Sequence, residues 1–443
     1  MPLSQTQIGT VRRLIEAAPD AAIRTLENAL ASGRNDNSIA EVHDLVSQEM
    51  VERRVRSSAF APIVAVCSTP SVVGLNLPAN ALTGLWRALR AETPETVDEA
   101  VQAVMSGRVV EDGPPIFDRL CGIAREKLKA REPGAFAALA ERLDAHAPGG
   151  TDNLVRVLVL APFVRSALPR LSAWVRNLGD EQGPAMRLAF RDATRDAENG
   201  TPLFMEILAT HLEERWHVLR LISVMMDRPS DRYLASSELA GFGEAVLAQI
   251  DGCVARVARF DPDLGAEAGA SAAASIASAV SMIGEFDQWL ALTKEGPWGS
   301  RIAEQRKALA AAVEGRLREA EAAVAAALPA QKPGYGGRAA RLVPKVSADP
   351  DPKAIRRAQA YLALVDGARM SAGNGGFGSL RLKVVEALEQ RLDPYIEDVL
   401  EMLRHNDGDL DRLRAFLDVA AQAMSAVRNP EAGDIVRRRA AAA

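Results

Sequence analysis

Helix-forming periodicity recurs along the whole chain and is the feature that most constrains its fold. The longest uninterrupted helical pattern covers residues 301–328. Its apolar residues follow one another at steps of three, four or seven, close to a coiled-coil seam: Ile302, Leu309, Val313, Leu317, Ala320, Val324 and Leu328. Strand-like alternation occurs only in "VRVLVL" and "RLVPKV", and neither has a partner run. We therefore expect an all-α protein.

Helix start signals and composition support the same fold class. Ser38 and Glu41 form a capping box at the start of an amphipathic segment. Alanine, the best helix former, is abundant, and aromatic residues make up only 5%. Pro162 and Pro169 must kink or divide the helix that follows residue 150. The sequence predicts a multi-helix bundle or irregular helical array with a separate C-terminal helical module.

Proline and glycine clusters divide the chain into four predicted segments. Residues 1–150 form an N-terminal helical module, and 151–328 a central helical domain that ends in the long helix. The stretch "PAQKPGYGGRAARLVPKVSADPDP" is typical of a linker and accounts for 329–352. A C-terminal helical module covers 353–443.

Charge, cysteine usage and hydropathy indicate where such a protein works. A net charge of −5 argues against a nucleic-acid partner. Cys67, Cys121 and Cys253 lie too far apart for paired spacing, which suits a reducing cytosol. The longest uncharged stretch, 268–284, is too short and too weakly apolar to predict a membrane span. Its small side chains require close packing, by default between the chain's own helices and alternatively against another chain. Because arginine far outnumbers lysine, we infer a GC-rich bacterial genome, and we expect a cytoplasmic bacterial protein.

The stretch "HLEERWHVLRLISVMM", residues 211–226, is the one candidate for metal chemistry. Taken as one straight helix, it places His211 and His217 about 120° apart, so the two cannot chelate one ion. Glu214 and His217 have the Glu-x-x-His spacing of carboxylate-bridged di-iron bundles, which need a second copy of that motif. The sequence has no second copy. We expect no metal site and no cofactor.

A glycine-rich stretch, "GNGGFGS", matches Gly-x-Gly-x-x-Gly but follows a predicted helix instead of a strand, so a dinucleotide fold is rejected. Two interpretations remain: a helix-breaking loop, and a weak anion site at the start of a helix capped by Ser379. The residues of that candidate anion site are Gly373, Gly375, Gly376, Gly378, Ser379 and Arg381.

Catalytic motifs are missing from the sequence. It has no Walker motif, no Gly-x-Ser-x-Gly elbow and no Cys/His pairing, which weakens the case for an enzyme without excluding one. The favoured hypothesis is a non-enzymatic scaffold or adaptor that binds a protein partner or self-associates. The candidate interface is the seam of the long helix, at Leu309, Val313, Leu317 and Val324, which either the chain's own helices or a partner must cover. The alternative is a helical enzyme or sensor that binds an anionic small molecule at residues 373–381.

Overall fold

The protein is all-α and divides into two compact units, Met1–Asp227 (unit 1) and Arg228–Ala443 (unit 2). The boundary falls inside the range 151–328, which the sequence analysis assigned to one domain. The computed structural model describes residues 4–31, 37–69, 71–106, 115–176, 182–195, 199–226, 229–332 and 342–443.

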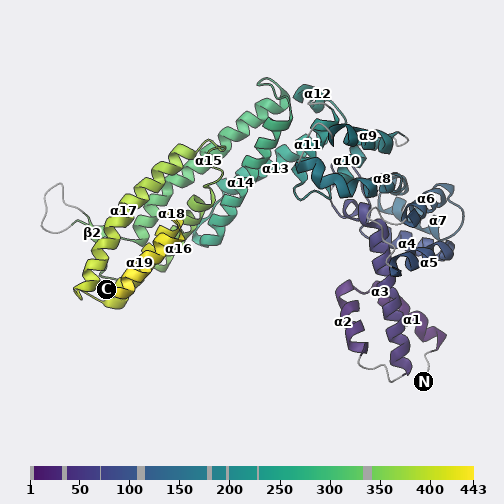
Figure 1. Ribbon diagram of the computed structural model, residues 1–443, viewed down its shortest axis with the longest axis horizontal. Coiled ribbons are helices and arrows are strands. Elements are labelled where there is room, and N and C mark those ends of the chain that lie inside the picture. Colours follow the sequence, from purple (N-terminus) through teal and green to yellow (C-terminus); the bar gives the residue numbers. More distant parts are fainter. Residues whose placement is uncertain are drawn as a thin grey trace. The chain divides into compact units, whose positions relative to one another are not determined.

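Unit 1 is built from eleven α-helices and two short 3₁₀ helices within its described residues. They are α1 (Gln5–Ala17), α2 (Asp20–Ala31), α3 (Asn37–Val64), η1 (Ala65–Cys67), α4 (Ala81–Glu92), α5 (Pro94–Met105), α6 (Pro115–Ala130), α7 (Ala135–His146), α8 (Gly150–Arg176), α9 (Gln182–Thr194), α10 (Gly200–Ala209), η2 (Arg215–His217) and α11 (Val218–Met225). α1 and α2 pack beside the first half of α3, and α8 packs against α3, α6 and α7 (Figure 1). α8 continues through both of its prolines as one helix.

A buried arginine donates to a carbonyl group that a proline leaves without its helical donor in α3. Pro62 has no N–H group, so the carbonyl of Ser58, four residues before it, lacks its helical donor. Arg165 of α8 donates to that carbonyl at 3.4 Å and to the Ala59 carbonyl at 2.7 Å. Its Nε also donates to Asp118 of α6 at 3.2 Å. One guanidinium therefore joins three helices at the centre of unit 1.

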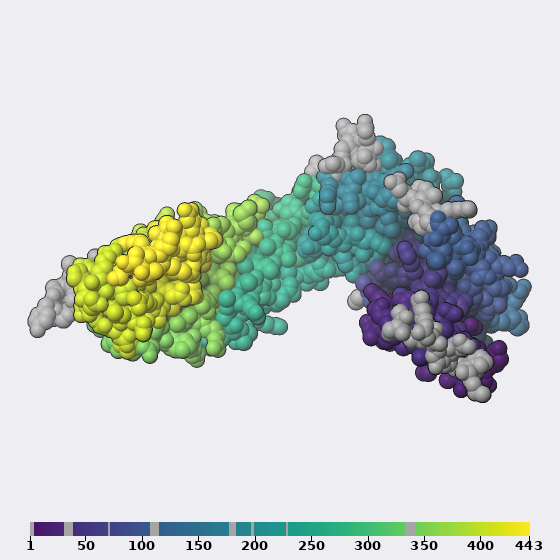
Figure 2. Space-filling model, turned by 60° about the horizontal axis from the view of Figure 1, so that its bottom comes forward, coloured from purple at the N-terminus to yellow at the C-terminus, as the bar shows by residue number. Residues whose placement is uncertain are grey.

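Unit 2 consists of long helices that run side by side (Figure 1). Its elements are α12 (Asp231–Ala235), α13 (Ala240–Ala258), η3 (Pro262–Leu264), α14 (Ala266–Trp289), α15 (Pro297–Ala327), β1 (Ala330–Gln331), β2 (Val343–Pro344), α16 (Pro352–Gly367), α17 (Gly378–Arg404), α18 (Leu410–Val427) and α19 (Pro430–Ala442). α19, yellow in Figure 2, lies on the surface of the unit and packs on α18. β1 and β2 form a two-residue antiparallel pair, so "RLVPKV" does have a partner, contrary to expectation.

Small residues set the distance between α14 and α16, which pack extensively against each other. A Cβ atom added at Gly269 would clash with the carbonyl of Ala360, and one at Gly367 would lie 2.6 Å from the Cβ of Ala273. The close packing expected of this small-residue stretch is therefore provided inside unit 2. By length and composition α14 is also the one described helix that would reach across a membrane, a property that buried core helices share.

The N-terminus of α15 is capped from a distant part of the sequence. Its N-cap residue is Gly296, which has no side chain to accept from the first-turn N–H groups. The buried carboxylate of Asp231 accepts from the N–H of Gly299 at 3.3 Å instead. A Cβ atom at Gly296 would clash with that carboxylate, so only glycine at this position lets Asp231 cap the helix.

Arginines from other helices or turns bind carbonyl groups at the C-terminal ends of seven helices. Carbonyls in the last turn of a helix lack the usual N–H partner from the helix itself, although that of Ile15 also accepts from the N–H of Ala18 at 3.2 Å. The bonds are Arg53 to Ile15 (α1), Arg220 to Val175 (α8), Arg187 to Val224 (α11), Arg316 to Ala258 (α13), Arg391 to Leu328 (α15), Arg381 to Val365 (α16) and Arg369 to Ala426 (α18), over 2.6–3.4 Å. Six of these arginines lie on another helix, and Arg369 lies in the turn after α16.

We expect Gly269→Ala to lower the free energy of unfolding by about 1–3 kcal/mol, because the added methyl group must push α14 away from α16. The matched control is Gly315→Ala on α15, where the glycine is exposed and a Cβ would meet nothing within 4 Å. That change should raise stability by about 0.5–1 kcal/mol through helix propensity. Urea unfolding followed by circular dichroism measures both, and equal effects of the two substitutions would contradict the close contact.

Candidate functional site

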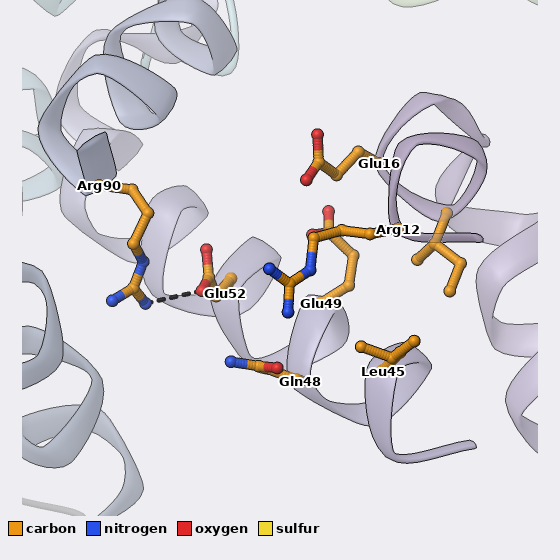
Figure 3. A pocket seen from close by; sticks show the side chains of 8 residues that line it. Arg12, Glu16, Leu45, Gln48, Glu49, Glu52 and Arg90 are labelled. Carbon is orange, nitrogen blue, oxygen red and sulfur yellow. Dashed lines mark hydrogen bonds and ion pairs between the residues drawn. The ribbon is translucent and has the colours of Figure 1, made fainter. Parts of the chain in front are cut away.

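A polar hollow lies between α1, α3 and α4 in unit 1 (Figure 3). Its volume is about 190 Å³. Charged and polar side chains dominate its lining, and two aliphatic side chains complete it. The lining residues are Arg12, Ile15 and Glu16 from α1, Leu45, Gln48, Glu49 and Glu52 from α3, and Arg90 from α4.

Each of the three lining carboxylates is already paired with an arginine. The pairs are Glu16 with Arg87 at 3.5 Å, Glu49 with Arg53 at 2.8 Å, and Glu52 with Arg90 at 2.6 Å. Glu52 also accepts from the indole Nε1 of Trp86 at 3.1 Å. Arg12 is different, because no carboxylate in the described parts of the chain pairs with it. The hollow therefore offers one guanidinium to another molecule.

Arg53 fixes the turn that places α1 beside the hollow. Its Nη2 donates to the carbonyls of Ile15, at 2.8 Å, and Glu16, at 3.3 Å, in the last turn of α1. Its Nη1 pairs with Asp20, the first residue of α2. Burial lowers the pKa of Arg53, but its hydrogen bonds to Glu49 and Asp20 outweigh that effect, so the pKa is raised and the side chain stays charged. The α1–α2 hairpin thus depends on one side chain of α3.

The glycine loop predicted as an anion site uses its polar groups internally. The N–H groups of Gly375 and Gly376 donate to the carbonyls of Ser371 and Gly373. Arg381 is 7% exposed, and its Nε donates to the Val365 carbonyl at 2.8 Å. Burial, together with the charge of Arg369, lowers the pKa of Arg381. In the structure this guanidinium caps α16, and no observation favours an anion beside it.

The start of α17 differs from the sequence prediction, and the backbone conformation of the loop explains one of its glycines. α17 begins at Gly378 with Phe377 as its N-cap, so Ser379 lies inside the first turn and does not cap the helix. Gly376 has φ of +79°, a left-handed conformation that favours glycine, and Gly373 has no atom near its would-be Cβ. Gly376 therefore serves the turn just before α17.

The seam of the long helix faces the chain's own helices. Leu309, Val313, Leu317 and Val324 are at most 1% exposed, and α15 packs against α13, α16 and α17. The sequence left open whether the chain or a partner covers this stripe, and the chain does. These four side chains are core residues of unit 2, so an interface with another protein must use other residues.

The stretch 211–226 is not one helix, contrary to expectation. α10 ends at Ala209, a turn follows, and helical structure resumes with η2 and α11. The angle between the two histidines derived from a straight helix was therefore wrong. His211 instead contacts the carbonyl of Pro62, in the last turn of α3, with its Nε2 at 2.8 Å. Among the residues that the structure describes, no three metal-ligand side chains come together.

Glu206 is a buried carboxylate that the sequence analysis did not single out. It is fully buried in α10, and its Oε1 accepts from the N–H of Val72 at 3.3 Å and lies 3.5 Å from Arg215. Its Oε2 has no hydrogen-bond partner in the described structure. Burial raises the pKa of Glu206 despite these two contacts. One acidic residue in the apolar run "PLFMEILA" was the available signal.

The three cysteines are free thiols in buried positions. Burial raises the pKa of Cys67 and of Cys121 to about 12, and it also raises the pKa of Cys253. Since the thiolate is the reactive form, these thiols are poor nucleophiles at neutral pH. They belong to the core.

Comparison with known proteins does not assign this chain to a family, so the protein is classified by its helical architecture alone. No protein-family model, curated protein or solved structure matches this chain. The fold defines an all-helical protein, and its polar hollow contains one guanidinium, that of Arg12, without a carboxylate partner among the described residues.

We expect Glu206→Gln to raise the free energy of unfolding at pH 7. The folded state holds the Glu206 proton more tightly than the unfolded state, whose pKa is near 4.5, so ionisation of this carboxyl costs stability as pH rises through its raised pKa. The gain from the substitution should vanish below about pH 4, where both states carry the proton. Calorimetry across pH 4–8, with the exposed Glu213→Gln as control, checks this. A variant less stable than the wild type at pH 7 would contradict it.

We expect Arg381→Lys to lower the free energy of unfolding by about 1–3 kcal/mol, because an ammonium group cannot reproduce the guanidinium's bond to Val365 from a buried position. Arg414→Lys on α18 is the matched control, since Arg414 is exposed and pairs only with Asp411 in the preceding turn. It should change stability by less than about 0.5 kcal/mol. If Arg381→Lys left chemical unfolding unchanged, its capping role would be disproved.

Proposed function

We propose that the protein is a helical scaffold or adaptor that binds a partner protein through its N-terminal module, defined as α1, α2 and residues 37–53 of α3. The carrying observation is that this module leaves much of its apolar side-chain surface only partly covered. Its core consists of Ile15, Ile23 and Val46. The apolar residues packed around them and only partly buried are Val11, Ala18, Leu30, Val42, Leu45 and Met50.

A core of three buried residues is small for three helices. The partly buried apolar residues leave surface that a partner protein can bury. Protein interfaces combine an apolar centre with a polar rim in which arginine is enriched. The hollow between α1, α3 and α4 has this composition, with Ile15 and Leu45 next to a ring of carboxylates and guanidiniums.

The occupant that fits best is an amphipathic helix of a partner protein. α1 and α3 lie side by side, and a further helix along them would complete a four-helix arrangement. Its apolar face would cover Val42 and Leu45. An acidic side chain on its edge would pair with Arg12, because the carboxylates around the hollow already have arginine partners.

The test begins with proteins captured on the immobilised full-length chain from a lysate of its own organism and identified by mass spectrometry. The captured protein is then purified, and its affinity is measured by calorimetry. We expect Arg12→Gln to weaken binding by about tenfold, because the partner's carboxylate loses its counter-charge. Arg13→Gln is the matched control, since Arg13 is exposed next to it and donates only to its own helix, to Gly9.

A charge exchange makes the result specific. Arg12→Glu should abolish binding, and replacing the partner's acidic residue with arginine should restore it. Equal affinity of the wild type and both Arg12 variants would overturn the proposal. Sedimentation of the purified chain tests the other possible occupant, a second copy of the same chain. If the Arg12 substitutions reduce self-association instead, the bound helix belongs to that second copy, and the proposal of a different partner fails.

A further inference from the structure

A second hollow in unit 1 lies between α4 and α7 and is lined with cationic side chains. Its volume is about 310 Å³. The lining contains no carboxylate, and its charged or titratable members are Arg87, Arg142 and His146. The remaining lining residues are Pro78, Asn80, Ala81, Thr83, Gly84, Leu139 and Leu143.

The close approach of α7 to α4 holds Arg142 at this place. A Cβ atom on Gly84, in the first turn of α4, would lie 2.8 Å from Cδ1 of Leu139 and 3.8 Å from Nη2 of Arg142. The Nε of Arg142 donates to the Ala138 carbonyl of its own helix at 3.2 Å, and no carboxylate in the described residues pairs with it. The guanidinium of Arg142 is therefore held by a backbone carbonyl but has no negatively charged partner among the described residues.

The start of α4 adds further donors to the same space. Its N-cap, Asn80, makes no side-chain capping bond. The N–H groups of Leu82 and Thr83 have no acceptor among the described residues. The N-terminus of a helix carries a partial positive charge, so it adds to the charge of Arg87 and Arg142. Arg142 has no carboxylate partner among the described residues and Arg87 has only Glu16, at 3.5 Å, so the lining carries a positive charge that an anion in the hollow would balance.

We propose that the hollow between α4 and α7 binds a small phosphorylated molecule through its phosphate group. Arg142 and Arg87 would donate to the phosphate oxygens with their planar guanidiniums, and the first-turn N–H groups of α4 would donate to the same group. A volume of about 310 Å³ lies at the small end of the range for ligand sites. It accommodates a phosphate with a short organic part. The lining residues of this site lie outside the N-terminal module, although Arg87 also pairs with Glu16 of α1, and phosphate binding does not require the proposed partner.

Isothermal calorimetry on the full-length chain tests the site with four probes: inorganic phosphate, pyrophosphate, ribose 5-phosphate and ribose. We expect the three phosphorylated probes to bind and ribose alone to give no heat. Tightest binding of ribose 5-phosphate identifies a phosphomonoester as the ligand class. Tightest binding of phosphate or pyrophosphate identifies an inorganic anion.

Three variants locate the binding. Arg142→Gln should weaken phosphate binding by about tenfold, because a charge-assisted bond is lost. Arg170→Gln, an exposed arginine of α8 outside the hollow, is the matched control and should bind as the wild type does. Glu16→Gln should bind phosphate more tightly, because Arg87 then no longer shares its guanidinium with Glu16 at 3.5 Å.

Opposite signs for Arg142→Gln and Glu16→Gln cannot come from general destabilisation of unit 1. Melting in chloride buffer confirms that each variant is folded. Absence of binding at millimolar phosphate, or equal affinity of the wild type and Arg142→Gln, would overturn the proposal. Equal weakening by Arg170→Gln would also overturn it, because such a result indicates diffuse attraction by surface charge.

Discussion

The bonding of helix-end carbonyls by arginines of neighbouring helices is the constraint on which both units depend. An all-helical protein leaves four carbonyl groups without partners at the end of every helix, and it has no sheet to align its elements. Here the guanidinium of a packed neighbour supplies the donor, as Arg53 does for α1 and Arg381 for α16. A guanidinium with its five donors can bond a carbonyl and a carboxylate together, which the single ammonium of lysine does less well. The excess of arginine, attributed to genome composition in the sequence analysis, therefore has a structural use.

The fold class was predictable because its signals are local. Spacing of apolar residues and helix caps act within a few positions, so the predicted helix at 301–328 and the observed α15 at Pro297–Ala327 agree closely. The break after Ala209 was not predictable in this way. Apolar periodicity continues on both sides of it, and no proline or glycine marks the turn. The interruption is accompanied by a contact of His211 with the Pro62 carbonyl in the last turn of α3, far away in the sequence.

The candidate sites show the same division between local and long-range information. Sequence identified Arg381 and the seam of α15 as notable residues, but it contained nothing about what packs against them. Arg381 is used by the end of α16, and Val313 and Leu317 by neighbouring helices. The hollow between α1, α3 and α4 combines Arg12 with Glu52 and Arg90, and each of these residues comes from a different helix. Side chains that converge only through tertiary packing leave no motif, and each of them resembles an ordinary surface charge in the sequence.

Arg87 connects the two hollows of unit 1. It lines the cationic hollow between α4 and α7, and its Nη2 lies 3.5 Å from Glu16, which lines the other hollow. A phosphate bound as proposed would draw this guanidinium towards α7 and away from Glu16, which would remove one contact between α4 and α1. Glu16 would then be an unpaired carboxylate beside the surface proposed for the partner helix, where it would repel the acidic side chain proposed to pair with Arg12. Binding free energies coupled through a shared residue are reciprocal, so the partner would in turn weaken the phosphate. If both proposals hold, the two ligands oppose each other through one arginine.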